Sequence, residues 1–290
     1  MRVFLAGGTG VYGRALIPRL LERGDSVVVL ARDVAGAASI AGSGIEVVAG
    51  DLLRDSPATL AKHMHDCDAA LHLATAIRPG AMGPDGANTT AALRTTGTRT
   101  LLDAVRAAGV PIYVQQSIVM AYADGGDRWL DEDAPFDTSA DRTPAVSPTL
   151  EMERMVHDLD PQQVRWCILR GGSFVGPGTA QEGAIERLRA GTLRVPGSGS
   201  NWVSFVHVED IAAATVAALD RAPAGSTFNI TDTPIRNGEY LDRLAGLVGA
   251  APPPRDGDAA LPRSYRCSNE AARRELRWQP RVGIWPARAP

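Results

Sequence analysis

Lysine is almost absent from this chain. Lys62 is the single lysine among 290 residues, and every other basic residue is arginine. The 30 basic residues are scattered among 33 acidic ones, and the net charge is −3 at pH 7. Because nucleic-acid-binding domains gather positive charge in runs or patches, the sequence predicts no nucleic-acid partner.

Long apolar runs and paired cysteines are also missing. The apolar stretches are strand-sized, too short to span a membrane, so we expect no membrane partner. The first strand is predicted to begin at the first residue, so we expect no signal peptide. His63 and His65 have no partners at metal-ligand spacing, and we predict no metal site. The cysteines are odd in number and far apart, which favours reduced thiols in a cytoplasmic protein: Cys67, Cys167 and Cys267.

An apolar run at the start of the chain ends in a cluster of glycines. Residues 1–6 are strand-like and residues 14–21 have helical spacing, and between them stand Gly7, Gly10 and Gly13. Glycines at this spacing allow a sharp turn, a close approach of the backbone to a diphosphate, and tight packing of the helix on the strand. A purely structural turn is the alternative. The strand–turn–helix context favours dinucleotide binding at the start of the helix.

Further apolar runs alternate with helical segments along the first half of the chain. The runs lie at 27–30, 45–52, 69–75 and 111–117, and a long helix over 91–108 follows a loop over 77–90 that is rich in glycine and proline. This alternation predicts an α/β fold with a Rossmann-type, doubly wound parallel sheet.

The pattern changes near residue 164, where shorter helices and proline-rich connectors begin. We predict a dinucleotide-binding Rossmann domain over residues 1–169, with a strand near 227–231 returning to its sheet. Residues 170–290 are predicted to form a smaller, interleaved substrate-binding lobe. A chain of this length, 44% hydrophobic, is large enough to bury a core for both parts.

The ends of the predicted strands suggest how a cofactor is bound. The second strand ends at Ala31-Arg32, where an arginine suits the 2′-phosphate of NADP and an acid would hold the ribose of NAD. We therefore predict NADP, with NAD as the alternative because Asp33 lies close by. Asp51 either contacts the adenine or caps the helix that starts near Pro57. The predicted cofactor-binding residues are Gly7, Gly10, Val11, Tyr12, Gly13, Arg32, Asp51, Leu52, Leu73, Ala74 and Thr75.

Ten short segments follow one another in a recognisable order along nearly the whole chain. They are Gly7-x-x-Gly10-x-x-Gly13, Asp51-Leu52, His72-Leu73-Ala74, Gly97-Thr98, Ser117, Leu169-Arg170, Gly176-Pro177-Gly178, Val206-His207-Val208, Phe228-Asn229-Ile230 and Trp278-x-Pro280. Together they resemble the extended and atypical short-chain dehydrogenases/reductases, the NAD(P)-dependent epimerase/dehydratase family. The resemblance implies a small-molecule substrate and a homodimer formed through helices near 91–108 and 149–159.

The usual catalytic pair of this family is absent. Its members use a tyrosine activated by a lysine four residues later, because a free tyrosine with a pKa near ~10 is a poor base. No Tyr-x-x-x-Lys exists in this chain. When the predicted helix over 149–159 is aligned with the family on its acid, Glu153, the tyrosine position holds Ala145 and the lysine position holds Thr149. Ser117 stands at the family's serine position, and Tyr122 is the best substitute for the tyrosine. Otherwise Tyr122 packs in the cleft wall and Ser117 satisfies backbone groups.

These observations predict an NADP-dependent oxidoreductase of the atypical short-chain type, with Ser117 and Tyr122 as its candidate catalytic residues. Its expected substrate is a carbonyl or alcohol of a small, partly apolar molecule. Two alternatives stay open. One is a non-redox enzyme on the same fold, such as a dehydratase, isomerase or cyclase. The other is a catalytically silent NADP-binding protein.

Overall fold

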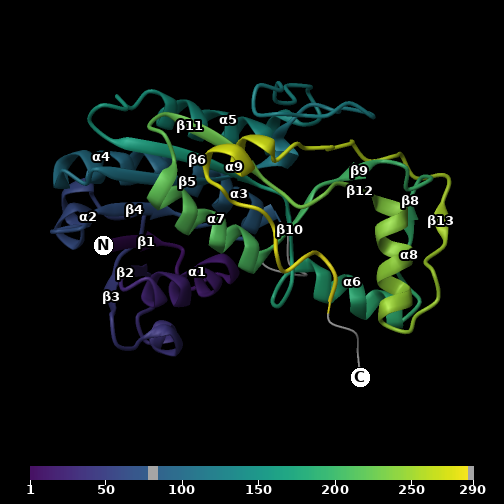
Figure 1. The fold of residues 1–290 in the computed structure, drawn as a ribbon, viewed down its shortest axis with the longest axis horizontal. Helices are drawn as coiled ribbons and strands as arrows, with labels where there is room; N and C mark the ends of the chain where they lie inside the picture. The colour runs from purple at the N-terminus through teal and green to yellow at the C-terminus, as the bar shows by residue number, and fades with distance from the viewer. Residues whose placement is uncertain (78–83, 287–290) are drawn as a thin grey trace.

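A seven-stranded parallel sheet lies at the centre of the computed structural model, which describes residues 1–77 and 84–286 (Figure 1). The strands pair in the order β11-β6-β5-β4-β1-β2-β3. This is the predicted doubly wound α/β fold, and β1 has β2 on one side and β4 on the other. Their bounds are β1 Arg2–Ala6, β2 Ser26–Ala31, β3 Ile45–Ala49, β4 Ala69–His72, β5 Ile112–Ile118, β6 Arg165–Gly171 and β11 Ser226–Ile230.

Helices cover both faces of the sheet because its strands are apolar on both faces. Val3 and Leu5 of β1 pack on the side of α1 and α7, whereas Phe4 and Ala6 pack on the side of α2, α4 and α5. The bounds of these helices are α1 Val11–Glu22, α2 Pro57–His63, α4 Thr98–Ala108, α5 Thr143–His157 and α7 Val208–Arg221.

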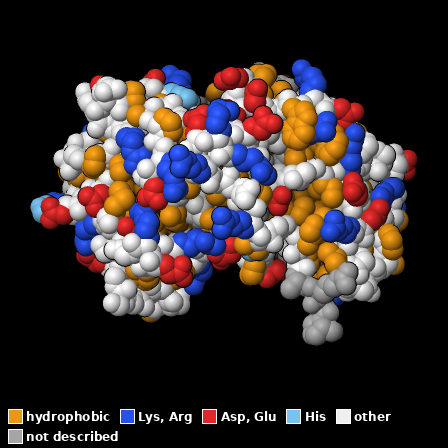
Figure 2. All heavy atoms as spheres, viewed as in Figure 1, with side chains coloured by type: hydrophobic (Ala, Val, Ile, Leu, Met, Phe, Trp, Pro, Cys, Tyr) orange, Lys and Arg blue, Asp and Glu red, His pale blue; other side chains and the backbone are white. Residues whose placement is uncertain are grey.

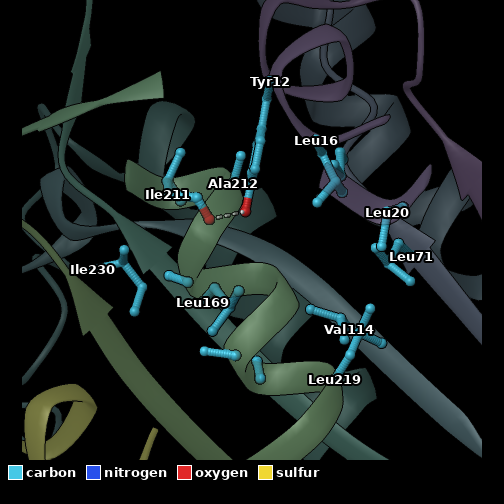
Figure 3. Close-up of a cluster of buried hydrophobic side chains, with 14 of the residues drawn as sticks. Tyr12, Leu16, Leu20, Leu71, Val114, Leu169, Ile211, Ala212, Leu219 and Ile230 are labelled. Atoms are coloured by element: carbon cyan, nitrogen blue, oxygen red, sulfur yellow. Dashed lines mark hydrogen bonds between the residues drawn. The ribbon is translucent and has the colours of Figure 1, made fainter. Parts of the chain in front are cut away.

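The side chain of Tyr12 points from the start of α1 into this core (Figure 3). Its hydroxyl lies 2.5 Å from Oγ1 of Thr215 and 3.5 Å from the carbonyl oxygen of Ile211, both on α7. Its ring meets Phe174 edge to face, with centroids 5.5 Å apart. Tyr12 therefore fixes α1 against α7, and only its backbone is left for a ligand at the glycine loop.

The predicted helix over 91–108 is interrupted and starts earlier. Residues 84–90, expected as loop, belong to α3 (Pro84–Ala92), and the rest of that predicted loop, residues 78–83, lies outside the described part of the chain. A π-helical turn, η2 (Leu93–Gly97), joins α3 to α4. The predicted end at Gly109 is confirmed, because this glycine caps α4 with φ of 68°.

The C-terminal part builds a second, smaller cluster beside the sheet, at the right of Figure 1. Phe205, Tyr240 and Trp285 stack at its centre. In Figure 2 acidic and basic side chains are interspersed over the α1 and α7 side, and apolar side chains gather over this C-terminal part. The remaining elements are η1 Gly36–Ile40, η3 Val119–Ala121, β7 Ser173–Val175, α6 Ala180–Arg189, β8 Val195–Pro196, β9 Trp202–Val203, β10 Phe205–His207, β12 Ile235–Arg236, α8 Asn237–Leu247, β13 Arg255–Asp256 and α9 Glu270–Glu275.

The predicted return of a late strand to the main sheet is visible in β11, which pairs with β6 in parallel from Ser226 to Ile230. The helix α7 also covers this sheet, so a single cut of the chain does not separate the two parts. Within the described residues, none of the helices combines the length and the apolar character that crossing a bilayer requires.

Substitution of Gly13 should destabilise the protein. A Cβ on Gly13 would lie 2.4 Å from the carbonyl oxygen of Gly7 and 2.5 Å from Cα of Gly8. We expect Gly13→Ala to lower the free energy of unfolding by about 1–3 kcal/mol in urea denaturation. The matched control is Gly183→Ala in α6, where nothing lies within 4 Å and a gain of about 0.5–1 kcal/mol is expected. Equal effects of the two substitutions would contradict the close packing of the loop.

Candidate active site

The glycine loop follows β1 at the carboxyl edge of the sheet. The order of the strands reverses at this point, because β2 and β3 lie on one side of β1, whereas β4, β5 and β6 lie on the other. Gly7 has φ of 101°, and a Cβ there would lie 2.6 Å from the carbonyl carbon of Leu73 and 2.7 Å from the nitrogen of Ala74. The segments after β1 and β4 are therefore in contact at the carboxyl edge of the sheet. Ligands of doubly wound folds bind at this switch point.

The start of α1 fits the diphosphate of a dinucleotide. Gly10 is its N-cap residue, no side chain caps the helix, and no acidic residue stands in the first turn. The amides of Val11, Tyr12 and Gly13 have no acceptor inside the helix, and they form the positive end of its dipole. The exposed Gly10 adds no side chain in front of them. An anion can therefore reach three amides at once.

The ends of β2 and β3 carry the residues expected near the adenosine. Arg32 is exposed after β2, and Asp33 turns back so that its Oδ1 accepts from the backbone N–H of Gly36 (2.9 Å). Asp51 accepts from the backbone N–H of Leu53 (2.9 Å). The alternative in which Asp51 caps α2 is wrong, because Ser56 is the N-cap residue of that helix and accepts from Thr59.

The exits of β3 and β4 contain the remaining predicted cofactor residues. Leu52 and Leu73 are buried, whereas Ala74 and Thr75 are half-buried and follow the strand toward the edge. These side chains place an apolar floor beside the glycine loop. Their part in cofactor binding stays a prediction.

Polar groups without partners are buried next to this floor. Both ring nitrogens of His72 and Oγ1 of Thr149 have no hydrogen-bond partner among the described residues. Burial lowers the pKa of His72 to about 4, so the ring is neutral at pH 7. Such orphan groups mark a place where a further ligand or water completes the hydrogen bonding.

Arg94 lies in the π-helical turn beside the same region and is 9% exposed. Burial lowers its pKa, and the charge of Glu153 partly offsets that effect. Single π-turns occur often at functional sites. The positive charge that the family places on α5 as a lysine is thus present here on a neighbouring helical turn, whereas α5 itself carries Thr149.

The two predicted catalytic residues lie in one buried network. Ser117 Oγ donates to Glu153 (2.5 Å), and Arg170 donates to both carboxylate oxygens of Glu153 (2.7 and 3.0 Å). Arg170 also donates to the hydroxyl of Tyr122 (2.7 Å), which in turn donates to Oδ1 of Asn229 (2.8 Å). All five residues are at most 7% exposed. The structure therefore brings Ser117 and Tyr122 together but closes them from solvent.

This placement favours the interpretation in which Tyr122 packs in a wall. Burial raises the pKa of Tyr122, and the adjacent Arg170 lowers it by less. The ring is fully buried and meets Phe136 edge to face. Ser117 bonds to a carboxylate rather than to the backbone groups considered above. Neither hydroxyl is free to reach a substrate in this arrangement.

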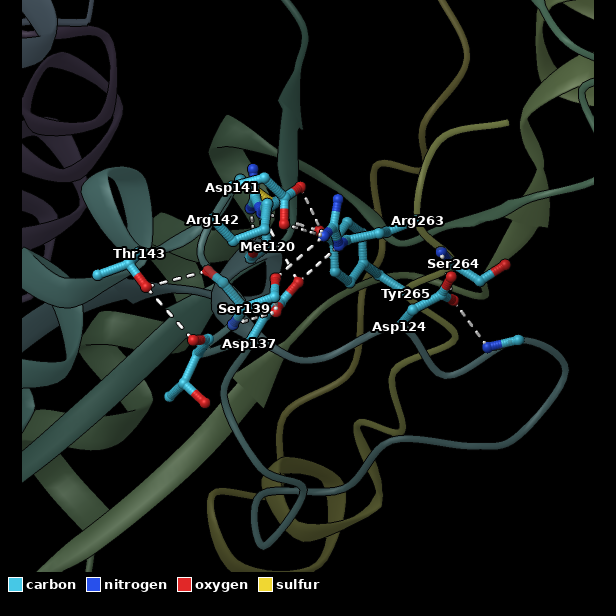
Figure 4. A network of polar contacts seen from close by, with 12 residues as sticks. Met120, Asp124, Asp137, Ser139, Asp141, Arg142, Thr143, Arg263, Ser264 and Tyr265 are labelled. Carbon is cyan, nitrogen blue, oxygen red and sulfur yellow. Dashed lines mark hydrogen bonds and ion pairs between the residues drawn. The ribbon is translucent and has the colours of Figure 1, made fainter. Parts of the chain in front are cut away.

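A cleft of about 370 Å³ opens near the exits of β5 and β6. Figure 4 shows part of its wall, where Arg142 and Arg263 approach Tyr265. Of the described residues that line it, none is acidic. They come from the turn after β5, the start of α5, the strand after β6, and the C-terminal lobe: Met120, Arg142, Ser173, Asn201, Val203, Asn237, Pro262, Arg263 and Tyr265.

Tyr265 is the cleft residue that sequence reasoning missed. Its hydroxyl accepts from Nη2 of Arg142 at 3.5 Å. Burial raises its pKa, and the charges of Arg142 and Arg263 act in the opposite direction, so the phenol is protonated at pH 7. Nothing in its local sequence, Arg263 to Cys267, marks it, because no Tyr-x-x-x-Lys spacing surrounds it.

Comparisons with known proteins find a matching family and related enzymes. A sequence model described as the NAD dependent epimerase/dehydratase family matches residues 3–231. The chain is 36% identical to a 3-diazoavenalumate denitrifying reductase of a Streptomyces species, over 98% of both chains. It is 31% identical to a UDP-glucose 4-epimerase of Mycolicibacterium smegmatis, over 98% of this chain and 95% of the other.

A solved structure also superposes on the whole chain. It is a dTDP-glucose 4,6-dehydratase of Streptomyces venezuelae, determined with NAD bound, and the TM-score is 0.81 at 24% identity. The match covers 98% of this chain and 93% of the other. At this identity the likeness shows the fold alone.

Removal of the central carboxylate should destabilise the protein strongly. Glu153→Ala leaves Arg170 buried without its ion pair, and we expect a loss of about 3–5 kcal/mol in the free energy of unfolding. Glu151→Ala is the matched control on the same helix, because its pair with Arg99 is exposed and worth at most about 1 kcal/mol. The network would not be structural if both variants unfolded at the same denaturant concentration.

Proposed function

Because the chain belongs to the NAD-dependent epimerase/dehydratase family and is an oxidoreductase-type enzyme, we propose that it is an NADPH-dependent reductase of a small, partly apolar molecule. The observation that carries the proposal is the position of the cleft. It opens beside Met120 and Ser173, at the carboxyl edge of the sheet that also holds the glycine loop. A cofactor on that loop and a substrate in the cleft would meet at this edge.

In this proposal the backbone amides at the start of α1 bind the diphosphate, and the exits of β3 and β4 line the adenine and ribose sites. When bound, NADPH supplies the hydride. The residues assigned to the cofactor are those predicted above, with Tyr12 contributing its backbone alone. Ser117 and Tyr122 are assigned as positioning residues, because their network ties the ends of β5, β6 and β11 to α5.

Tyr265 is assigned as the proton donor for a carbonyl substrate. Its hydroxyl accepts a hydrogen bond from Arg142, which leaves its own proton free to be donated into the cleft. Burial raises the pKa of Tyr265, so the phenol carries its proton at pH 7. The guanidinium of Arg142 would stabilise the phenolate left behind.

A second candidate function is reduction of an aromatic diazonium group with loss of N₂. Two observations favour it: the missing Tyr-x-x-x-Lys pair, and the named activity of the Streptomyces relative. A diazonium group already carries a positive charge, so a hydride added to its terminal nitrogen gives a neutral diazene. The diazene then loses N₂: its C–N and N–H bonds break, and the hydrogen moves from nitrogen to the ring carbon. The net reaction consumes no added proton, whereas reduction of a carbonyl to an alcohol consumes one.

We propose NADPH rather than NADH because of the end of β2. Ala31 stands where an acid would hold the ribose, Arg32 is exposed beside it, and Asp33 is engaged in its own turn. On the first turn of α1, Arg14 donates to Oγ of Ser39 (3.2 Å) and adds a second positive charge near this position.

The choice of cofactor is tested with Arg32→Gln. We expect the Kd for NADPH to rise about tenfold or more, because a charge-assisted hydrogen bond is worth about 1.5–3 kcal/mol. The Kd for NADH should stay within about twofold of the wild-type value. Arg106→Gln on α4 is the control and should change neither constant in calorimetric titrations. An equal loss for both cofactors would contradict the assignment of the 2′-phosphate to Arg32.

The reaction is tested by following the nicotinamide absorbance band with a panel of aromatic aldehydes, ketones and diazonium compounds. We expect NADPH oxidation with at least one class. Tyr265→Phe should lower kcat for a carbonyl substrate by about 10²–10⁴-fold and leave a diazonium substrate within about twofold. NADPH binding without oxidation would favour a silent binding protein. Conversion without net oxidation of NADPH would select a dehydratase, isomerase or cyclase.

A further inference from the structure

The wall of the cleft offers hydrogen-bond donors and positive charge that the described chain does not use. Nε of Arg142 is buried and has no hydrogen-bond partner within residues 1–77 and 84–286. Its nearest carboxylate oxygen there, Oδ2 of Asp137, lies 3.9 Å away. The Nη2 atom of Arg142 donates to the carbonyl oxygen of Met120 (2.9 Å) and to the hydroxyl of Tyr265. A buried donor without an acceptor is costly, so this position calls for a ligand acceptor.

Asp137 is held more closely by other groups than by Arg142, from which it lies 3.9 Å away (Figure 4). Its Oδ2 lies 2.5 Å from Nε of Arg263, and its Oδ1 accepts from the backbone and the hydroxyl of Ser139 (3.0 and 2.5 Å). Asp141 is directed to Arg263 as well (2.8 Å). Arg263 is therefore paired twice at short distance, whereas Arg142 has a single longer ion pair and a donor, Nε, that no described residue uses.

Asn201 provides a second, independent observation on the same cleft. It is 3% exposed, it lines the cleft, and its Oδ1 has no hydrogen-bond partner among the described residues. Its backbone carbonyl is used by the N–H of Asn237, which fixes the residue in place (2.9 Å). The amide oxygen can therefore accept a hydrogen bond from a ligand.

We propose that the substrate is a small hydroxylated carboxylic acid, whose carboxylate binds Arg142 and whose hydroxyl donates to Asn201. This inference rests on the proposed function and adds the substrate class. The apolar parts of the wall, Met120, Val203 and Pro262, suit an aromatic or unsaturated skeleton between the two polar ends. Arginine is the residue best matched to a carboxylate, because its planar fork can donate two parallel hydrogen bonds.

The test measures binding rather than turnover. Calorimetry on the NADP⁺-loaded protein compares 4-hydroxycinnamate, its methyl ester and cinnamate as probes. We expect the acid to bind at least about tenfold more tightly than the ester, and Arg142→Gln to abolish that difference. Arg142→Lys keeps the charge and should keep part of the preference. Asn201→Ala should remove the preference for 4-hydroxycinnamate over cinnamate and leave the preference for acid over ester.

The matched control is Arg128→Gln, an exposed arginine outside this cleft, which should bind all probes as the wild type does. Thermal unfolding of each variant separates loss of the fold from loss of the site. Equal binding of acid and ester by the wild type, or an unchanged preference in Arg142→Gln, would overturn the inference. So would NADP⁺ binding without any probe binding, and in that case the proposed reductase would stand. Failure of NADP⁺ itself to bind would overturn both.

Discussion

The close approach of two backbone segments at the centre of the sheet is the constraint on which the site depends. Gly7 passes so near to Leu73 and Ala74 that no side chain can stand there. This contact holds the glycine loop over the carboxyl ends of the paired strands β1 and β4, where the uncapped α1 begins. The helix dipole and its free amides then create a place for a diphosphate, whatever the substrate is. The fold thus prepares the cofactor site before any charged side chain contributes.

The chain keeps the architecture of its family and redistributes the charges around the reaction centre. The lysine position on α5 carries Thr149, while buried arginines stand nearby in η2 and β6 as Arg94 and Arg170. Arg170 is committed to Glu153, so it organises the sheet edge rather than a substrate. The hydroxyl that does face the cleft comes from the C-terminal part, as Tyr265. In the proposed reductase, the acceptor's own electrophilicity would matter more than it does in the usual Tyr–Lys enzyme.

Much of the fold could be predicted from the sequence because local patterns encode it. The continuous apolar runs identify strands buried on both faces. Gly109 predicts a helix end because glycine readily adopts the positive φ that the cap of a helix requires. The π-helical turn and the early start of α3 could not be predicted, since neither leaves a period or capping signal in the local sequence. Ser117 and Tyr122 stand at positions that suggest catalysis, but both side chains are buried in the core. There Ser117 bonds to Glu153, and Tyr122 bonds to Arg170. Arg142, Asn201 and Tyr265 are far apart in sequence, and only the folded chain brings them to one cleft.

The central claim is that a nicotinamide dinucleotide binds across the switch point, with the cleft beside its reactive end. Hydrogen–deuterium exchange of the protein with and without saturating NADPH tests it most directly, because it reports on individual backbone segments. The account predicts slower exchange in residues 7–13 and 72–75, with smaller protection around 117–120. Protection confined to other segments, or no protection at the glycine loop while NADPH is bound, would contradict it.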